Sequence, residues 1–295
     1  MCSSDLNIMI EIHKNLKAVG ILTRNAIDQK DAINTLKKIL EKYEVSVLLE
    51  HHIAAELNEV GCSLDEMLKN TNLIISVGGD GNFISTCRKC ASSGVFVFGV
   101  HTGHLGFLTD VTLNQCDKFF EEFFRGCYEI EKPYMLGAKF KKDDKIMEKL
   151  AFNDIVLMRR KIDSTSNIEA FLNSKYFNSY FGDGVIISSA MGSTAYNMSA
   201  GGAIIYPLCD VFSLTPVCSH SLTQRPLILP KEFKVEFKSC DDVVVLIDGQ
   251  DRVDLKNYTS VEVGISDVRV NLIRHKDRDY FEILKQKLRW GHNDK

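Results

Sequence analysis

The stretch LIISVGGDGN, residues 73–82, decides how the fold is interpreted. Its first half, residues 73–77, is an apolar run with the length and composition of a buried strand. The glycines that follow allow a tight turn, after which a helix is predicted to begin near Asn82 and to end before Gly94. A strand that passes through a glycine turn into a helix is typical of a parallel sheet covered by helices.

Segments on both sides of this stretch continue the alternation of strands and helices. Short apolar runs typical of buried strands cover residues 17–22, 45–49 and 95–100. Apolar residues recur at helical spacing over residues 33–43, where Asp28 is a candidate helix cap, and another helix is expected over residues 54–60. Together these patterns predict an α/β region with helices on the faces of a parallel sheet.

The pattern changes after Gly126, and all five prolines lie beyond that point. Phe233, Val235 and Phe237 alternate with charged residues, which is typical of a half-exposed antiparallel strand. Further β-rich runs cover residues 151–158, 185–188, 243–247 and 261–265. The last stretch, residues 277–290, returns to a helical pattern. The chain therefore falls into two differently built regions, of which the second is mostly β.

The composition is that of an ordinary globular protein, and 295 residues suffice for about two domains. With 36 Lys and Arg against 39 Asp and Glu, the net charge of −3 argues against a protein held to nucleic acid, although a local loop can still bind phosphate. No apolar run approaches the roughly 18 residues of a membrane span. The nine cysteines are irregularly spaced and the N-terminus has no signal-peptide pattern. We therefore expect reduced thiols, a cytoplasmic location and no membrane partner.

One CxxC pair, Cys87 and Cys90, and two histidines three residues apart, His101 and His104, raise the question of a metal site. A structural zinc site takes four ligands, usually from two such pairs, and no second CxxC occurs. Two buried thiols on one helix explain Cys87 and Cys90 more simply. We therefore expect no dedicated metal site.

The glycine turn of Gly78, Gly79, Asp80 and Gly81 is a candidate phosphate cradle. Ligands of open α/β sheets gather at the carboxyl ends of the strands, where backbone N–H groups and a helix N-terminus favour an anion. A carboxylate in such a loop repels phosphate, so Asp80 needs another role. It can act as a general base for an attacking hydroxyl, or it can cap the helix at a turn without chemical function.

A second segment rich in glycine and small polar residues spans residues 183–203. Its apolar start predicts a buried strand, which a short helix follows. Gly192, Ser193 and Thr194 could present N–H and hydroxyl groups to a phosphate or a ribose, and Tyr196 could stack on a base. The alternative is a close-packed turn in which small residues serve only for fit. Two such segments in one chain favour a shared ligand.

The two segments together resemble the NAD kinase family. The GGDG turn is shared with diacylglycerol and sphingosine kinases, but the pattern DGxxxSxxxGSTAYxxSAGG over residues 183–202 makes the resemblance specific. Further stretches fit the family, namely Asn153-Asp154, the TGxLGFL segment within residues 101–110, Arg225-Pro226-Leu227 and Asp248-Gly249-Gln250. The sequence departs from the family pattern at His101, His104 and Met191.

Members of that family transfer the γ-phosphoryl group of ATP, or in some cases polyphosphate, to the 2′-hydroxyl of the adenosine ribose of NAD, giving NADP. The resemblance implies that Asp80 is the general base and that Asn153 and Asp154 hold the adenosine part. The resemblance also implies that Gly81 binds nucleotide and that Gly78, Gly79 and Asn82 lie with it near the phosphates. Further nucleotide contacts, some of them in the site of a neighbouring subunit, are implied at Asp183, Thr194, Ala195, Tyr196, Asn197, Met198, Ser199 and Gln250.

The resemblance also implies a domain organisation and a set of partners. Residues 1–131 form an α/β domain, residues 132–266 a β-rich domain that binds NAD, and residues 267–295 pack back onto the first domain, with the site between the domains. A divalent cation, Mg²⁺, is expected to arrive with ATP, because phosphoryl transfer needs charge neutralisation. A homodimer or homotetramer is expected. The alternatives are a lipid kinase with the same turn and a nucleotide sensor that binds without catalysis. The sequence leaves open whether NADH or polyphosphate is a substrate and whether NADPH exerts feedback.

Overall fold

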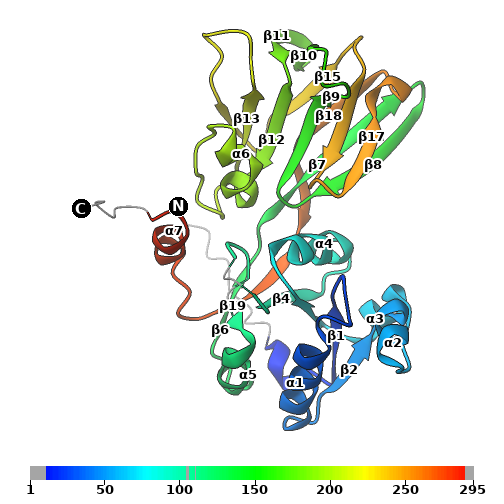
Figure 1. The fold of residues 1–295 in the computed structure, drawn as a ribbon, viewed down its shortest axis with the longest axis vertical. Helices are drawn as coiled ribbons and strands as arrows, with labels where there is room; N and C mark the ends of the chain where they lie inside the picture. The colour runs from blue at the N-terminus through cyan, green and yellow to red at the C-terminus, as the bar shows by residue number, and fades with distance from the viewer. Residues whose placement is uncertain (1–10, 104–105, 110, 290–295) are drawn as a thin grey trace, which may run out of the picture. The chain divides into compact units, whose positions relative to one another are not determined.

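The computed structural model describes residues 11–103, 106–109 and 111–289 (Figure 1). The chain divides into two compact units. Unit 1 contains the described residues of Met1–Thr86, Ser93–Ile130 and Leu272–Lys295, and unit 2 contains Cys87–Ser92 and Glu131–Asn271. The chain therefore leaves unit 1 after Ile130 and returns to it at Leu272.

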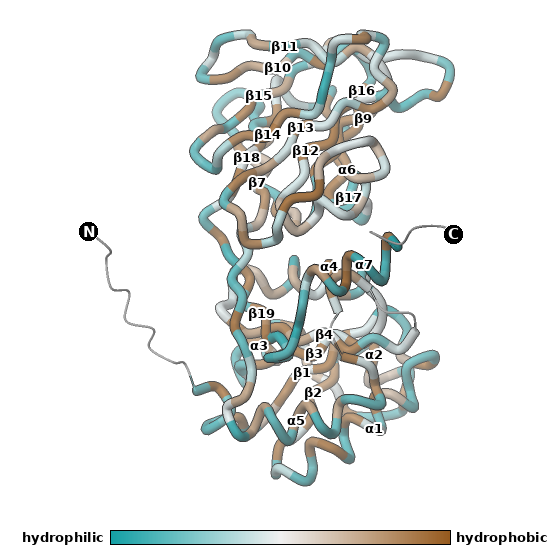
Figure 2. Tube along the Cα trace, turned by 90° about the vertical axis from the view of Figure 1, so that its left-hand side faces the viewer, coloured by the Kyte–Doolittle hydropathy of each residue, from teal (hydrophilic) through white to brown (hydrophobic). Residues whose placement is uncertain are grey.

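Unit 1 is built on a seven-stranded sheet with the order β2-β1-β3-β4-β19-β6, in which β5 also pairs with β4. Its strands are β1 (Ala18–Leu22), β2 (Ser46–Leu49), β3 (Leu73–Val77), β4 (Phe96–His101), β5 (Val111–Thr112), β6 (Tyr128–Glu131) and β19 (Asn271–His275). The pairs within β1 to β5 are parallel. The hydropathy colouring marks β1 and β3 as hydrophobic segments (Figure 2), in keeping with strands buried on both faces.

The α-helices of the first 130 residues lie between the strands along the chain, with α2 and α3 in succession, and a further helix belongs to the C-terminal segment. They are α1 (Lys30–Glu41), α2 (His51–Leu57), α3 (Leu64–Asn70), α4 (Asp80–Cys90), α5 (Cys116–Phe124) and α7 (Tyr280–Leu288), with short 3₁₀ turns at η1 (Ile12–Asn15) and η2 (Leu113–Gln115). The predicted order of strand, glycine turn and helix is confirmed, because β3 passes through the turn directly into α4.

Several helix boundaries differ from the expectation. Helix α4 begins at Asp80 rather than near Asn82. Asp28 is not the cap of α1, because the cap position is Gln29 and the Asp28 carboxylate instead accepts from Nδ2 of Asn25 at 2.6 Å. Helix α7 begins at Tyr280, where the side chain of Asp279 caps two backbone N–H groups, so the residues before Asp279 are not helical.

Unit 2 contains two six-stranded sheets with antiparallel strand pairs. The first has the order β11-β10-β15-β18-β7-β8, from β7 (Tyr134–Lys142), β8 (Lys145–Ala151), β10 (Ser166–Leu172), β11 (Lys175–Gly182), β15 (Lys234–Lys238) and β18 (Ser260–Arg269). The second has the order β14-β13-β12-β9-β16-β17, from β9 (Asp154–Arg159), β12 (Gly184–Ser189), β13 (Val211–Val217), β14 (Leu227–Pro230), β16 (Val243–Ile247) and β17 (Asp251–Asp254).

The two sheets of unit 2 share one hydrophobic core. Ile168 and Phe237 of the first sheet and Val185 and Val245 of the second are fully buried in it. The predicted fold class is confirmed: an α/β unit with parallel strand pairs, a β-rich unit, and a C-terminal segment whose strand β19 lies between β4 and β6. Among the described residues, no helix is both long and apolar enough to cross a membrane.

Candidate active site

The glycine turn connects the carboxyl end of β3 to the first residue of α4. Gly78 has a φ of 144°, which favours glycine, and its N–H donates to the carbonyl of Val100 at 3.0 Å. A side chain at Gly79 would meet nothing within 4 Å, so the turn has open space beside its backbone. An added side-chain carbon at Gly81 would lie 3.6 Å from Nη1 of Arg24, an exposed residue just beyond β1. Sequence reasoning missed this arginine, because nothing in its local pattern connects it to the turn.

The carboxylate of Asp80 is held by a separate segment of unit 1. Its Oδ2 accepts the backbone N–H of Phe107 at 2.8 Å, and its Oδ1 accepts that of Leu108 at 3.2 Å. A side chain at Gly106 would lie 1.8 Å from Oδ1, so the segment can approach only with glycine at this position. These bonds belong to the TGxLGFL stretch, of which His104 and Leu105 lie outside the described residues, as does the nearby Asp110. These two hydrogen bonds thus give the carboxylate a fixed position beside the turn.

Asn82 has a structural role in this turn. Its side chain is buried, and Nδ2 donates to the carbonyls of Leu22 and Val77 and to Oγ of Ser76, at 3.1, 3.2 and 2.8 Å. The amide therefore joins the ends of β1 and β3 to the start of α4. Because the side-chain amide is used in these bonds, Asn82 can contribute to phosphate binding only through its backbone.

In unit 2, the segment of Phe152, Asn153 and Asp154 between β8 and β9 is held by Asp248. The Asp248 carboxylate accepts all three of its backbone N–H groups, at 2.8, 2.7 and 3.0 Å. Asn153 is 7% exposed, and its Oδ1 is buried without a hydrogen-bond partner. A buried acceptor without a donor is costly, so a ligand donor is the simplest use for this oxygen. Sequence reasoning found Asn153 and Asp154 but gave no role to Asp248.

The carboxyl groups of Asp154 and Asp248 form a buried, coupled pair. Burial and the neighbouring Asp248 raise the pKa of Asp154 to about 7. Burial also raises the pKa of Asp248, but three backbone N–H groups and the nearby Arg88 favour its charged form. Of the two carboxyl groups, Asp154 therefore holds a proton more readily, because the amide donors and Arg88 lie on Asp248.

The GSTAY segment forms a 3₁₀ turn, η3 (Met191–Thr194), and a short helix, α6 (Tyr196–Ser199). Two of its predicted ligand residues are used inside the protein. Oγ of Ser193 donates to the carbonyl of Ile205 and accepts the N–H of the same residue. The fully buried side chain of Asn197 makes four hydrogen bonds, to Ser193, Ala203, Ser213 and Thr215.

The remaining residues of this segment differ in exposure. Tyr196 is 39% exposed and Ser199 is exposed, whereas Thr194 is buried and Ala195 and Met198 are intermediate. Met191 is buried as well. A side chain at Gly192 would lie 2.2 Å from the carbonyl oxygen of Asn153, so this glycine brings the GSTAY and Asn153 segments together. The structure thus joins the two predicted nucleotide-binding motifs of unit 2.

Asp183 lies at the other end of β12. The register pairs Ser188 with Asp154 and Gly184 with Met158, so the two aspartates are separated by the length of a six-residue strand, roughly 15 Å. The Asp183 carboxylate accepts from Nε of Arg159 at 2.6 Å, and this bond holds the pKa of Asp183 below its usual value. The Oε1 atom of Gln250 accepts from Nη1 of Arg88 at 3.4 Å, and Arg88 also lies beside Asp248.

The candidate metal ligands do not converge. Among the described residues, no group of three or more His, Cys, Asp and Glu side chains could hold a metal ion. Cys87 and Cys90 are both buried on α4. His101 is 3% exposed, and its Nδ1 lies 3.1 Å from the carbonyl oxygen of Gly103, while His104 lies outside the described residues.

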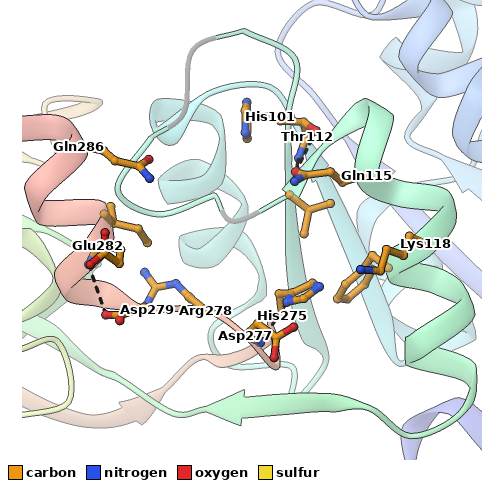
Figure 3. A pocket seen from close by; sticks show the side chains of 13 residues that line it. His101, Thr112, Gln115, Lys118, His275, Asp277, Arg278, Asp279, Glu282 and Gln286 are labelled. Carbon is orange, nitrogen blue, oxygen red and sulfur yellow. Dashed lines mark hydrogen bonds between the residues drawn. The ribbon is translucent and has the colours of Figure 1, made fainter.

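Unit 1 also has a cavity of about 510 Å³ (Figure 3), and Asp80 is not among the described residues that line it. Its walls come from the end of β4, from β5, η2 and α5, and from the stretch around the start of α7. Lys118, His275 and Arg278 supply basic groups, and Asp277, Asp279 and Glu282 supply acidic ones. Because the lining carries both signs of charge, its charge does not indicate a class of ligand.

Known proteins are similar to this one over nearly the whole chain. Residues 6–128 match the family model for the ATP-NAD kinase N-terminal domain, and residues 152–275 that for the C-terminal domain. A curated NAD kinase of Campylobacter jejuni is 47% identical over 280 residues, covering 95% of this chain and 98% of that protein. One from Sulfurimonas denitrificans is 40% identical over 281 residues, covering 95% and 99%.

Two solved structures share the fold. A yeast NADH kinase complexed with NADH matches with a TM-score of 0.86 at 24% identity, covering 95% of this chain and 89% of that chain. An NAD kinase from Archaeoglobus fulgidus in complex with ATP matches with a TM-score of 0.73 at 24% identity, covering 92% and 98%. With curated relatives of nearly equal length at up to 47% identity, the chain belongs to the NAD kinase family of enzymes.

Proposed function

We propose that this enzyme transfers the γ-phosphoryl group of ATP to the 2′-hydroxyl of the adenosine ribose of NAD, giving NADP, with Asp80 as the general base. The observation that carries the proposal is the Asp80 carboxylate, held by the N–H groups of Phe107 and Leu108 beside an open glycine turn. A carboxylate fixed by two amides keeps further lone pairs for a substrate hydroxyl. A base held in one place suits phosphoryl transfer, because enzymes accelerate this reaction largely by positioning the reacting groups.

Asn153 and Asp154 are proposed to bind the adenosine part of NAD. The buried Oδ1 of Asn153 requires a donor, and the 6-amino group of adenine is the donor that the base offers. Asp154 lies next to it and carries a proton up to a pH of about 7, so its carboxyl can both donate to and accept from a ribose hydroxyl. Thr194, Ala195, Met198 and the backbone of Asn197 are proposed to line the same nucleotide site.

The phosphates are proposed to bind at Gly78, Gly79, Gly81 and the backbone of Asn82. The guanidinium of Arg24, next to Gly81, adds a positive charge that a chain of net charge −3 otherwise lacks there. Mg²⁺ is proposed to enter as part of the ATP substrate, because phosphoryl transfer needs the negative charge of the triphosphate to be neutralised. ATP is favoured over polyphosphate by the ATP-NAD kinase domain matches and by the related kinase solved with ATP.

The enzyme is proposed to work as a homodimer or homotetramer. Asp183 is roughly a strand length from Asp154, so it is better placed for the nucleotide of a neighbouring subunit, together with the exposed Tyr196 and Ser199. Gln250 is proposed to bind nucleotide from its place beside Arg88. Light scattering at micromolar concentration tests the assembly, and a monomeric mass would contradict it.

We propose residues 1–131 as the domain for phosphate binding, residues 132–266 as the domain for NAD binding, and residues 267–295 as a segment that completes the first. A cytoplasmic location is proposed as well, because the nine irregularly spaced cysteines fit a reducing compartment. No nucleic acid or membrane partner is needed for this reaction.

One assay tests the function directly. Purified protein is incubated with ATP, Mg²⁺ and NAD, and NADP is measured with an NADP-specific dehydrogenase. NADP formation supports the proposal. ATP consumption that requires lipid vesicles instead of NAD would identify a lipid kinase, and binding of NAD without turnover would identify a nucleotide sensor. Parallel reactions with NADH and with polyphosphate define the acceptor and the donor.

A further inference from the structure

Asp248 occupies a turn that does not need its carboxylate. The hairpin between β16 and β17 turns at Asp248 and Gly249, whose φ angles are 52° and 62°, and the N–H of Gln250 donates to the carbonyl of Ile247 at 2.9 Å. These are the features of a type I′ turn, for which Asn-Gly and Asp-Gly are both well suited. The choice of aspartate at position 248 therefore has its reason outside the turn.

That reason is the adjacent backbone of residues 152–154. The side chain of Asp248 is 0% exposed, and its two oxygens accept three successive backbone N–H groups at 2.7 to 3.0 Å. Nε of Arg88 lies 3.5 Å from Oδ2 and balances the buried charge. Only an acceptor on both branches of the side chain satisfies this set, whereas asparagine would turn a donor toward one or more of the amides.

The same segment is fixed from its carbonyl side as well. The carbonyl of Phe152 accepts from Oγ of Ser189 at 2.6 Å, that of Asn153 from the N–H of Ser189 at 2.8 Å, and that of Asp154 from the N–H of Asp248 at 2.9 Å. Every backbone polar group of the three residues is therefore paired. On the side chain of Asn153, Oδ1 is buried without a hydrogen-bond partner.

We propose that Asp248 is a positioning residue for NAD, which fixes the backbone of Phe152, Asn153 and Asp154 so that the Asn153 amide meets the adenine 6-amino group. This inference rests on the proposed function. An acceptor that is fixed before the ligand arrives loses little freedom on binding, and it discriminates against a base without the donor. Asp248 acts through the backbone and does not itself contact the nucleotide.

The test compares wild-type enzyme with Asp248→Asn, which keeps the turn and removes part of the amide acceptance. NAD and an analogue that carries hypoxanthine in place of adenine, and so lacks the 6-amino group, serve as acceptors. For Asp248→Asn we expect the KM for NAD to rise about tenfold or more, with kcat and the KM for ATP changed by less than about threefold. We also expect the preference for NAD over the analogue to shrink by about tenfold, which a merely structural defect would not cause.

Two matched substitutions serve as controls. Asp143→Asn makes the same change at an exposed left-handed turn residue, with φ of 50°, between β7 and β8 of the same unit. Asp251→Asn removes the second carboxylate partner of Arg88, whose Nη2 lies 2.5 Å from Asp251 Oδ2, and leaves the three amide bonds intact. Neither control should alter the preference for NAD over the analogue.

The outcomes separate this inference from the proposed function. If wild-type enzyme makes no NADP, the proposed function fails. If it does, and Asp248→Asn keeps the wild-type KM and analogue preference, the positioning role is wrong, as it is if Asp251→Asn gives the same loss. Should Asp248→Asn not fold, Ser189→Ala loosens the same segment from its carbonyl side, and an unchanged analogue preference in that variant would equally overturn the inference.

Discussion

The backbone N–H of Phe107 donates to Oδ2 of Asp80 at 2.8 Å, across 27 residues of sequence. The neighbouring N–H of Leu108 donates to Oδ1 of the same carboxylate at 3.2 Å. Leu108 is itself anchored, because its carbonyl accepts from Nη1 of the buried Arg274 at 2.6 Å. A chain of contacts thus runs from β19 through this segment to the candidate base, all within unit 1.

Replacing Asp80 with asparagine tests the base directly. Asp80→Asn keeps the size of the side chain and removes its ability to accept a proton, so kcat should fall by about 10²–10⁴ while the KM for NAD changes little. Initial rates of NADP formation at saturating ATP give both constants. Asp117→Asn, which removes an exposed carboxylate from the first turn of α5, is the matched control and should keep wild-type turnover. Near-normal turnover in Asp80→Asn would refute the base role.

Gly106→Ala should displace the Asp80 carboxylate while leaving the aspartate itself in the sequence. The added carbon would lie 1.8 Å from Oδ1 of Asp80, which forces the carboxylate or the segment to move. A displaced base should reduce kcat by about tenfold or more, because misplacement of about 1 Å is enough for such losses. Steady-state kinetics measure the effect. Gly103→Ala in the same stretch meets nothing within 4 Å and should have wild-type kcat; equal losses in both variants would mean that position 106 has no special relation to Asp80.

Local sequence patterns were sufficient for strands formed by unbroken apolar runs, but not for every strand or helix: β10 (Ser166–Leu172) and β11 (Lys175–Gly182), for example, were not predicted. The strands Leu73–Val77 and Val243–Ile247 coincide with the predicted runs, because unbroken apolar segments have few alternatives to a buried strand. Helix α3 was missed, since Met67 is its one buried residue and no apolar period results. A capping box between Ser63 and Glu66 was the available signal for that helix.

The candidate site likewise contains one residue that the local sequence reveals and partners that it does not reveal. Asp80 stands out locally, because a carboxylate in a glycine turn needs an explanation. The partners that hold it could not be foreseen, since Phe107 is 27 residues away and the bonds from Phe152, Asn153 and Asp154 to Asp248 span 94 to 96 residues. Side chains that bond only to distant backbone leave no periodic trace in the sequence.

The raised pKa of Asp154 makes stability depend on pH. Because the folded pKa is about 7 and the usual value is 3.8, the folded state holds a proton that the unfolded state releases between these values. Stability contributed by protonated Asp154 is therefore lost as pH rises through this window. Asp154→Asn cannot titrate, so its stability relative to wild type should increase by about 3 kcal/mol between about pH 5 and about pH 8. Urea unfolding of both proteins at the two pH values measures this difference.

Asp183→Asn is the control for that measurement. The hydrogen bond from Arg159 holds the pKa of Asp183 below its usual 3.8, so the group stays charged in both states over the whole range. Its stability difference from wild type should be the same at both pH values. A constant difference for Asp154→Asn as well would show that Asp154 titrates normally in the folded protein.

Asn197→Asp should destabilise the GSTAY segment. The buried Nδ2 donates to the carbonyls of Ser193 and Ala203, both at 3.0 Å, and a carboxylate cannot replace these bonds. Oδ1 accepts from Ser213 and Thr215 at 3.0 and 2.6 Å, so the residue joins η3 and α6 to β13. Two lost donors and a buried acid should reduce the free energy of unfolding by about 3 kcal/mol or more, measured by urea denaturation.

The loss in Asn197→Asp should also grow with pH. A buried carboxyl without cationic partners has a raised pKa, so its charged form is the more costly one and the deficit should be larger at about pH 8 than at about pH 5. Asn173→Asp makes the same exchange at an exposed turn residue with φ of 51°, a conformation that aspartate tolerates, and should cost less than about 0.5 kcal/mol at either pH. Equal losses at both sites would mean that the hydrogen bonds of Asn197 do not hold the segment, and its place among the nucleotide-binding residues would then need a direct ligand contact.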